Sequence, residues 1–265
     1  MRKKLLSGLA AVALLYSAVT QSCVLRMAAE TNFPPYQLLK QQSWQGQTVE
    51  LARLLAAEVG CDLKFVDIPW LRSLAQIKSG ELDMVSHMSY SEARRRDFAF
   101  VGPHHIESMW LIGNPDKLPK VSALKDLSKT VDLGRIAELN GAYYGEEFAL
   151  LKQNPFFARQ LVSISSIQDK LALLEAGRVN AILEDGSVLH YWQSQKYKNA
   201  EKYRPLVLVY RSPVYFGFSK KSLSKAMLVK LQKAWQKLYD QGIIEKTVKR
   251  YQRKTTDVLT PSTTL

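Results

Sequence analysis

The chain has few of the residues from which metal centres and nucleophilic sites are commonly built. It contains two cysteines and four histidines among 265 residues. Two widely spaced cysteines do not make a zinc site. His104 and His105 are adjacent, so a regular strand would point their side chains to opposite faces. Nucleophile elbows, His-Glu-x-x-His motifs, phosphate-binding loops and dinucleotide fingerprints are all absent from the sequence. We therefore expect no metal, no cofactor and no nucleophilic triad.

Long apolar runs are also missing, with one exception at the N-terminus. A basic start at residues 2–4 precedes an apolar run from Leu5 to Val19, and the polar residues Thr20 and Ser22 follow. This pattern is typical of a secretory signal, because the run is short for a membrane span and ends at a cleavage-like site. We expect residues 1–22 to be a cleaved signal peptide and the mature protein to be soluble and periplasmic. The alternative is an uncleaved N-terminal anchor.

Acidic residues are fewer than basic ones, which gives a formal net charge of +13. Loss of the three basic residues in the signal would lower it to +10. Such a charge can indicate nucleic-acid binding. The basic residues are scattered over most predicted helices, however, and an exported protein rarely meets nucleic acid. We expect no nucleic-acid partner and a mild preference for anionic ligands or surfaces.

The two cysteines, Cys23 and Cys61, each precede a predicted strand. In an oxidising compartment a pair of this kind favours a disulfide. If the two strands are parallel neighbours, their first residues lie side by side and a bridge is possible. The alternative is a lipid-modified Cys23, although Thr20 stands where a lipoprotein signal would have a Leu-like residue.

Short apolar runs alternate with amphipathic helical patterns along most of the chain. We expect strands at 24–28, 62–68 and 82–88 with helices at 48–60 and 70–80 between them. The same alternation recurs later in the chain. We expect strands within 129–137, at 159–164 and at 178–184, and helices at 145–154, 166–177 and 187–195. This alternation predicts an α/β protein of two similar lobes, each a mainly parallel sheet flanked by helices.

Two extended crossings, around 107–115 and 212–220, are predicted to join the lobes as hinge strands. Helices at 223–242 and 243–252 should then pack back on the first lobe. The expected division is 23–110 with 214–258 for the first lobe, 111–213 for the second, and a loose tail at 259–265.

The stretch from Ser89 to Pro103, SYSEARRRDFAFVGP, carries three arginines directly after a predicted strand. Ser91 is a good cap for a short helical turn, whose backbone N–H groups would favour an anion. Open α/β sheets bind ligands at the carboxyl ends of their strands. A guanidinium there can hold a carboxylate through two parallel hydrogen bonds. The alternative is three solvated arginines, as in most charge runs.

Four segments in order carry a resemblance to a known family. They read LRMAAETNFPPYQLL, WQGQTVELARLLAAEVG, LAQIKSGELDMVSHMSYSEARRRDFAFVGP and LEAGRVNAILEDGSV. Together they resemble the family 3 periplasmic solute-binding proteins, which serve amino-acid ABC importers, over roughly residues 25–219. The resemblance implies a two-lobed type II periplasmic-binding-protein fold that closes on its ligand.

The resemblance also implies roles for particular residues. Arg94 would bind a ligand α-carboxylate with help from Ser89, while Arg95 and Arg96 would face solvent. Asp185 would bind an α-ammonium, besides capping the helix that follows it. The remaining implied ligand-binding residues are Glu30, Phe33, Trp70, His87, Gly141 and Tyr143.

The expected function is capture of a polar amino acid or related small carboxylate by a monomeric exported protein, with delivery to an ABC permease. One alternative is a dehydratase of the cyclohexadienyl or arogenate type on the same fold, with Glu184, Asp185 or His87 as the acid. The other is a sensory module that presents its closed form to a membrane receptor.

Overall fold

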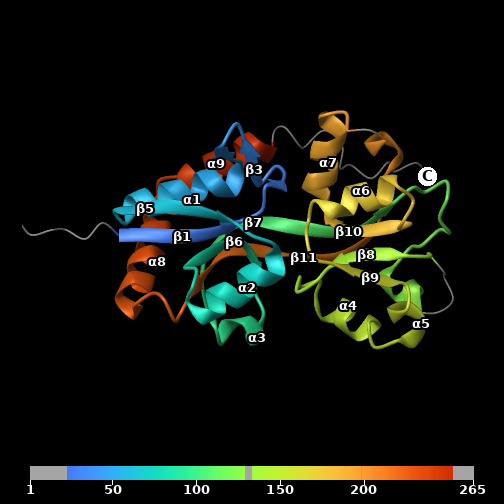
Figure 1. Ribbon diagram of the computed structural model, residues 1–265, viewed down its shortest axis with the longest axis horizontal. Coiled ribbons are helices and arrows are strands. Elements are labelled where there is room, and N and C mark those ends of the chain that lie inside the picture. The colour runs from blue at the N-terminus through green and yellow to red at the C-terminus, as the bar shows by residue number, and fades with distance from the viewer. Residues whose placement is uncertain (1–22, 129–132, 198, 253–265) are drawn as a thin grey trace, which may run out of the picture.

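Two α/β lobes lie side by side and share one continuous sheet (Figure 1). The computed structural model describes residues 23–128, 133–197 and 199–252. The predicted signal peptide and the predicted tail, residues 1–22 and 259–265, lie outside the described residues. The strand order is β5-β1-β6-β11-β7-β10-β8-β9. Within this eight-stranded sheet, the strands that belong to a single lobe pair in parallel, as the sequence pattern predicts.

The first lobe begins with a β-α-β-α-β unit whose helices end at glycines. Gly60 and Gly80 have φ angles of +70° and +86°, a conformation that residues with a Cβ adopt at a cost. The elements of the unit are β1 (Cys23–Ala29), α1 (Gln47–Glu58), β5 (Cys61–Asp67), α2 (Trp70–Ser79) and β6 (Met84–Ser89). A small antiparallel ribbon lies between β1 and α1, and a short helix follows β6; these are β2 (Asn32–Phe33), β3 (Gln37–Lys40), β4 (Ser43–Gln45) and α3 (Glu92–Arg95).

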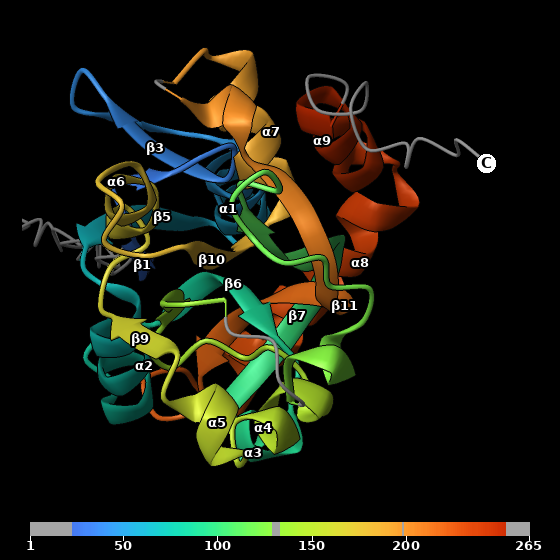
Figure 2. The same cartoon turned by 90° about the vertical axis from the view of Figure 1, so that its right-hand side faces the viewer.

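The second lobe repeats the architecture with shorter elements. Its parallel strands are β8 (Ile136–Leu139), β9 (Leu161–Ile164) and β10 (Ala181–Asp185). Its helices are α4 (Glu146–Leu151), α5 (Pro155–Ala158), α6 (Asp169–Glu175) and α7 (Gly186–Ser194), with 3₁₀ turns η1 (Leu124–Ser128) and η2 (Ala200–Lys202). Figure 2 shows α7 on one side of β10, with α4 and α5 on the other.

The helix expected at 145–154 is shorter in the structure, since α4 ends at Leu151. A separate helix, α5, begins just after the expected range. Asn154 accepts hydrogen bonds from the backbone N–H groups of Phe156 and Phe157 and so caps α5. Pro155 takes the first position of this helix, where its missing N–H has no cost.

Two long strands cross from one lobe to the other. They are β7 (Phe98–Gly113) and β11 (Arg204–Ser219), which pair in antiparallel fashion along their whole length. The crossings expected at 107–115 and 212–220 are the later parts of these longer strands. β6 pairs with the first-lobe half of β11, and β10 pairs with the second-lobe half of β7. Register shifts interrupt the β7–β11 ladder, which bends and twists the strands.

One such shift corrects the expectation for His104 and His105. His105 pairs with Val214 and Val101 with Phe216, so β7 carries extra residues at this point. The regular alternation of faces is lost there. Both histidines are buried, and their Nδ1 atoms lie 2.6 Å apart. Burial lowers the pKa of His104 to about 3 and that of His105 well below its ordinary value, so both are neutral at physiological pH.

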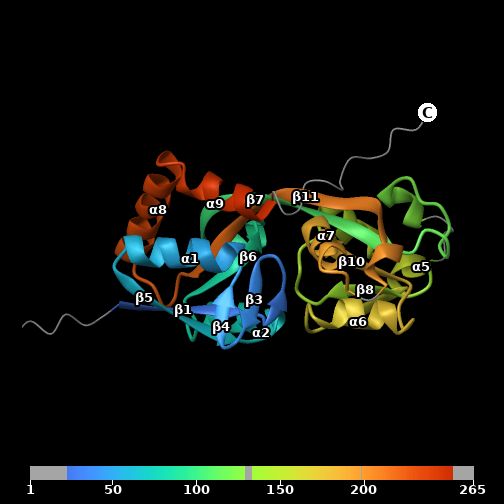
Figure 3. The ribbon, with the colours of Figure 1, turned by 90° about the horizontal axis from the view of Figure 1, so that it is seen from above.

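The C-terminal helices return to the first lobe. Figure 3 shows α8 (Lys225–Asp240) and α9 (Ile243–Gln252) beside α1 in the first lobe. Ser224 caps α8, and an apolar stripe that includes Leu231 and Trp235 is buried against the sheet. The first lobe is therefore discontinuous in sequence.

A disulfide joins Cys23 and Cys61, which are register partners at the start of β1 and β5. The Cα atoms lie 4.5 Å apart, and the sequence separation is 38 residues. Closing a loop of this length stabilises the fold by roughly 3–4 kcal/mol on the chain-entropy account. The predicted disulfide is confirmed, and it occupies the sulfur that lipid modification would need.

Apolar side chains form one core in each lobe and a third cluster between them. Leu25, Leu51 and Trp235 belong to the first-lobe core, and Phe148 and Phe157 to the second-lobe core. The third cluster takes residues from both lobes, among them Phe33, Trp70, Leu139 and Ile167. The lobes are thus packed against each other along the edges of a shared pocket.

Candidate functional site

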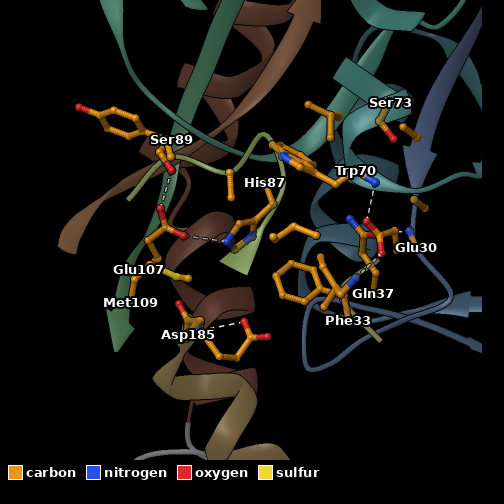
Figure 4. A pocket seen from close by; sticks show the side chains of 18 of the residues that line it. Glu30, Phe33, Gln37, Trp70, Ser73, His87, Ser89, Glu107, Met109 and Asp185 are labelled. Carbon is orange, nitrogen blue, oxygen red and sulfur yellow. Dashed lines mark hydrogen bonds and ion pairs between the residues drawn. The ribbon is translucent and has the colours of Figure 1, made fainter. Parts of the chain in front are cut away.

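The pocket lies between the lobes, at the carboxyl ends of β1, β6 and β10, where open α/β sheets bind ligands. The space that it encloses, together with the solvent at its mouth, is about 690 Å³. Figure 4 shows Glu107 and Asp185 at one end, Glu30 and Gln37 at the other, and His87 between them. The sequence-predicted residues that line the pocket are Glu30, Phe33, Trp70, His87, Ser89, Arg94, Tyr143 and Asp185.

Arg94 extends from α3 into the pocket and reaches the second lobe. Its guanidinium donates one hydrogen bond to the Ser89 carbonyl at 2.9 Å and another to the Gly141 carbonyl at 3.0 Å. Trp70 and Tyr143 face the guanidinium at 5.7 and 5.9 Å, from opposite lobes. Burial lowers the pKa of Arg94, but an arginine this basic stays charged. Three of its five N–H groups remain for a ligand, since each carbonyl accepts one.

The neighbouring arginines differ from Arg94. The side chain of Arg95 is 63% exposed and forms a salt bridge with Glu92 on the surface, and Arg96 is exposed. Helical spacing explains this separation. Ser91 accepts a hydrogen bond from the Arg94 N–H and fixes the turn, so that only the third helical residue is directed toward the pocket.

Asp185 supplies a negative charge from the second lobe. It is 2% exposed and caps α7, because its Oδ1 accepts the Ser187 N–H at 2.6 Å. Its Oδ2 has no hydrogen-bond partner among the described residues. Burial, followed by the charge of Glu107, raises the pKa of Asp185 to about 6. A buried carboxylate oxygen without a donor is suited to a ligand ammonium or other N–H group.

Glu107 was not predicted, and it links Ser89 to His87. Its carboxylate accepts the Ser89 hydroxyl at 2.5 Å through Oε1 and lies 3.2 Å from His87 Nε2 through Oε2. The Ser89 hydroxyl, expected to assist at the ligand, is therefore bonded to Glu107, while its carbonyl binds Arg94. The sequence feature that could have pointed to Glu107 is an acidic residue in a largely apolar crossing segment. Glu107 is 4% exposed there.

Glu30 connects the lobes directly. Its Oε1 accepts the Trp70 N–H at 2.7 Å, and its Oε2 accepts the Ile167 N–H at 3.0 Å across the pocket from the second lobe. Burial raises the pKa of Glu30. The sequence suggested a ligand-binding acid, and the structure shows both carboxylate oxygens bonded to protein groups.

The walls of the pocket are apolar and aromatic. Phe33 packs edge-on against His87 with ring centroids 5.0 Å apart, while Trp70 lies beside Arg94. Gly141 does not line the pocket but supplies the carbonyl that Arg94 binds. Its φ is +77°, a left-handed conformation that favours glycine over residues with a Cβ.

A buried ion pair that the sequence did not reveal lies beside Asp185. Lys170 of α6 places its Nζ 3.0 Å from Glu184 Oε2, and both side chains are 2% exposed. The second oxygen of Glu184 accepts the Asp185 N–H. The sequence of α6 did not indicate that Lys170 is buried, because a single lysine in an amphipathic helix usually faces water. Among residues 23–128, 133–197 and 199–252, no cluster of ligating side chains could hold a metal ion.

Comparisons with known proteins identify the fold and the family. The fold is that of the type II periplasmic binding proteins. The chain matches the bacterial extracellular solute-binding proteins, family 3, over residues 25–254, and it belongs to that family. The resemblance seen in the sequence is thus confirmed.

Individual relatives are distant. The arginine-binding extracellular protein ArtP of Bacillus subtilis (strain 168) is 24% identical over 173 residues, which are 63% of this chain and 64% of that protein. An ancestral arginine-binding protein bound to arginine has a TM-score of 0.73 at 19% identity, covering 86% of this chain and 97% of the other. A histidine kinase sensor domain with similarity to periplasmic binding proteins has a TM-score of 0.72 at 21% identity, covering 87% and 96%.

No helix within the described part of the chain is both long and apolar enough to cross a membrane. The family is one of extracellular proteins.

Proposed function

We propose that this protein captures an amino acid or a related small carboxylate between its lobes, closes around it by bending β7 and β11, and delivers it to an ABC importer. The observation that carries the proposal is the placement of Arg94 and Asp185. They come from different lobes, face one buried pocket and carry opposite charges. A ligand with a carboxylate and an ammonium would bind both and so favour the closed arrangement.

The physical setting strengthens both contacts. Phe33 and Trp70 exclude water, and charge interactions grow as the local dielectric falls. Two of the named relatives support the ligand class, because both are arginine-binding proteins. The proposal includes export through the signal at residues 1–22, action as a monomer, and lobes formed by 23–110 with 214–258 and by 111–213.

Arg94→Ala tests the proposal. A thermal-shift screen of the parent protein against amino acids and small carboxylates should identify ligands, since a tight ligand raises Tm by mass action. Calorimetry with the best ligand should then show at least a thirtyfold loss of affinity in Arg94→Ala, as expected when a buried charged contact is truncated.

The matched control is Arg95→Ala, which removes the same side chain one residue along on the exposed face. Its affinity should equal that of the parent. Unchanged affinity in Arg94→Ala, or an equal loss in both variants, would contradict the proposal.

A further inference from the structure

The charges that line the pocket are unequal in number. Four carboxylates belong to its lining, and two cationic side chains face them. The carboxylates are Glu30, Glu107, Glu184 and Asp185, and the cations are Arg94 and Lys170. Each carboxylate residue is at most 9% exposed, so bulk water screens these charges weakly.

Pairing among these charged groups does not remove the excess of negative charge. Lys170 is paired with Glu184 at 3.0 Å, and this pair is neutral as a unit. Arg94 then remains opposite three carboxylates. Its two hydrogen bonds go to backbone carbonyl groups. Among the described residues, no carboxylate lies within salt-bridge distance of its guanidinium. The nearby negative charge of Glu107 favours the charged form of Arg94. Glu107 therefore offsets part of the positive charge that Arg94 offers a ligand.

Hydrogen bonding in the pocket points the same way. Among the described residues, Asp185 Oδ2 and His87 Nδ1 are buried in the pocket lining and have no hydrogen-bond partner. A ligand with additional N–H groups can donate to the carboxylate oxygen of Asp185.

We infer that the pocket selects a ligand with a net positive charge, specifically an amino acid whose side chain carries a second cationic group. This inference rests on the proposed function, because it assigns the ligand carboxylate to Arg94. A zwitterion leaves the excess of buried negative charge unchanged. A ligand with one carboxylate and two cationic groups reduces it and also brings additional N–H donors.

Three probes of nearly equal shape test the inference by calorimetry on the whole mature protein. L-Arginine carries both cationic groups, L-citrulline replaces the charged guanidinium with a neutral ureido group, and agmatine lacks the carboxylate. We expect arginine to bind at least tenfold more tightly than citrulline. In Glu107→Gln the arginine-to-citrulline ratio should fall several-fold toward one, because one negative charge is removed without a change of shape.

Glu92→Gln is the matched control, since it removes the same charge from an exposed position on α3. Its arginine-to-citrulline ratio should equal that of the parent. Citrulline binding as tightly as arginine in the parent overturns the inference, and so does an unchanged ratio in Glu107→Gln. If Glu107→Gln does not fold, the parent protein alone provides the test. Its affinity ratio for arginine over citrulline is measured, followed by its ratio for L-lysine over L-norleucine, and both ratios should favour the cationic ligand.

The agmatine arm separates this inference from the proposed function. Agmatine binding as tightly as arginine would contradict the carboxylate contact of Arg94 and leave the preference for cations standing. Tight binding of amino acids without regard to side-chain charge would contradict only the present inference.

Discussion

The two lobes place their charged groups by the same local device, a parallel strand that ends at the first turn of a helix. In the first lobe, β6 runs into α3, where Ser91 is the cap and Arg94 reaches the pocket. In the second lobe, β10 runs into α7, and Asp185 is both the cap and the pocket residue. The positive group is therefore at the end of a long side chain, whereas the negative group is fixed to the backbone.

This difference has an energetic consequence. Arg94 is held by two carbonyl groups and two aromatic rings, so its charge is well accommodated without a ligand. Asp185 lies beside Glu107 and keeps one oxygen without a donor. The comparison indicates that more uncompensated charge lies around Asp185 than around Arg94. The predictions below perturb the two walls, from the largest expected effect to the smallest.

Lys170→Met should cause the largest loss of stability. It leaves Glu184 buried without its counter-ion, which costs about 3–5 kcal/mol of unfolding free energy. Urea denaturation measures the loss. The double variant Lys170→Met with Glu184→Gln should recover part of it, because the stranded charge is removed. Lys249→Met on α9 breaks an exposed pair and serves as the control, with no measurable change expected. A single variant as stable as the parent would show that the pair is unimportant.

Asp185→Asn should stabilise the ligand-free protein at pH 8. The pKa of Asp185 is about 6 in the folded protein against an ordinary value of 3.8, so the folded state binds more protons between these values. Its contribution to stability is present below pH 4 and is lost as the pH rises through 6. Asparagine caps α7 equally well but has no charge to bury. The expected gain is roughly 3 kcal/mol at pH 8, and none at pH 3.5.

Thermal melts of Asp185→Asn and the parent at both pH values measure this gain. The charged or titratable groups that face Asp185 are Tyr36, His87, Glu107 and Glu184, and they are identical in both proteins. The same variant should bind amino acids more weakly. A gain that does not depend on pH would rule out the buried charge as its cause.

Ser91→Ala should have the smallest effect and should act on the first-lobe wall. It removes the side chain that accepts the Arg94 N–H at the start of α3. A lost cap costs about 1 kcal/mol, and a looser α3 should also weaken ligand binding slightly. Denaturation and calorimetry measure the two effects. Ser91→Thr keeps the hydroxyl and should restore both, and a failure to restore them would argue against capping as the cause.

The larger features of the fold were predictable because they depend on local patterns. Alternating apolar runs and glycine-terminated helices predicted β1, α1, β5, α2 and β6 close to their observed bounds. The Cys23–Cys61 disulfide followed from two cysteines placed before parallel strands. The stretch of three arginines drew attention because it follows a predicted strand, at the edge of the sheet where ligands bind. The choice of Arg94 among the three, and of Asp185, came from the resemblance to the solute-binding family.

Other features depended on irregularities that no local pattern marks. The extra residues in β7 bring His104 and His105 to the same side, against the alternation of a regular strand.

The sequence by itself determined which segments become strands and helices, where the cysteines meet, and which strand ends carry charge, because these depend on residue order within short stretches. Only the tertiary structure decided how the charges are partnered. Glu107 meets Ser89 and His87, Lys170 meets Glu184, and Glu30 joins the lobes because residues distant in sequence become neighbours in the folded chain. The balance of charge in the pocket depends on those contacts, and so does the class of ligand that we infer.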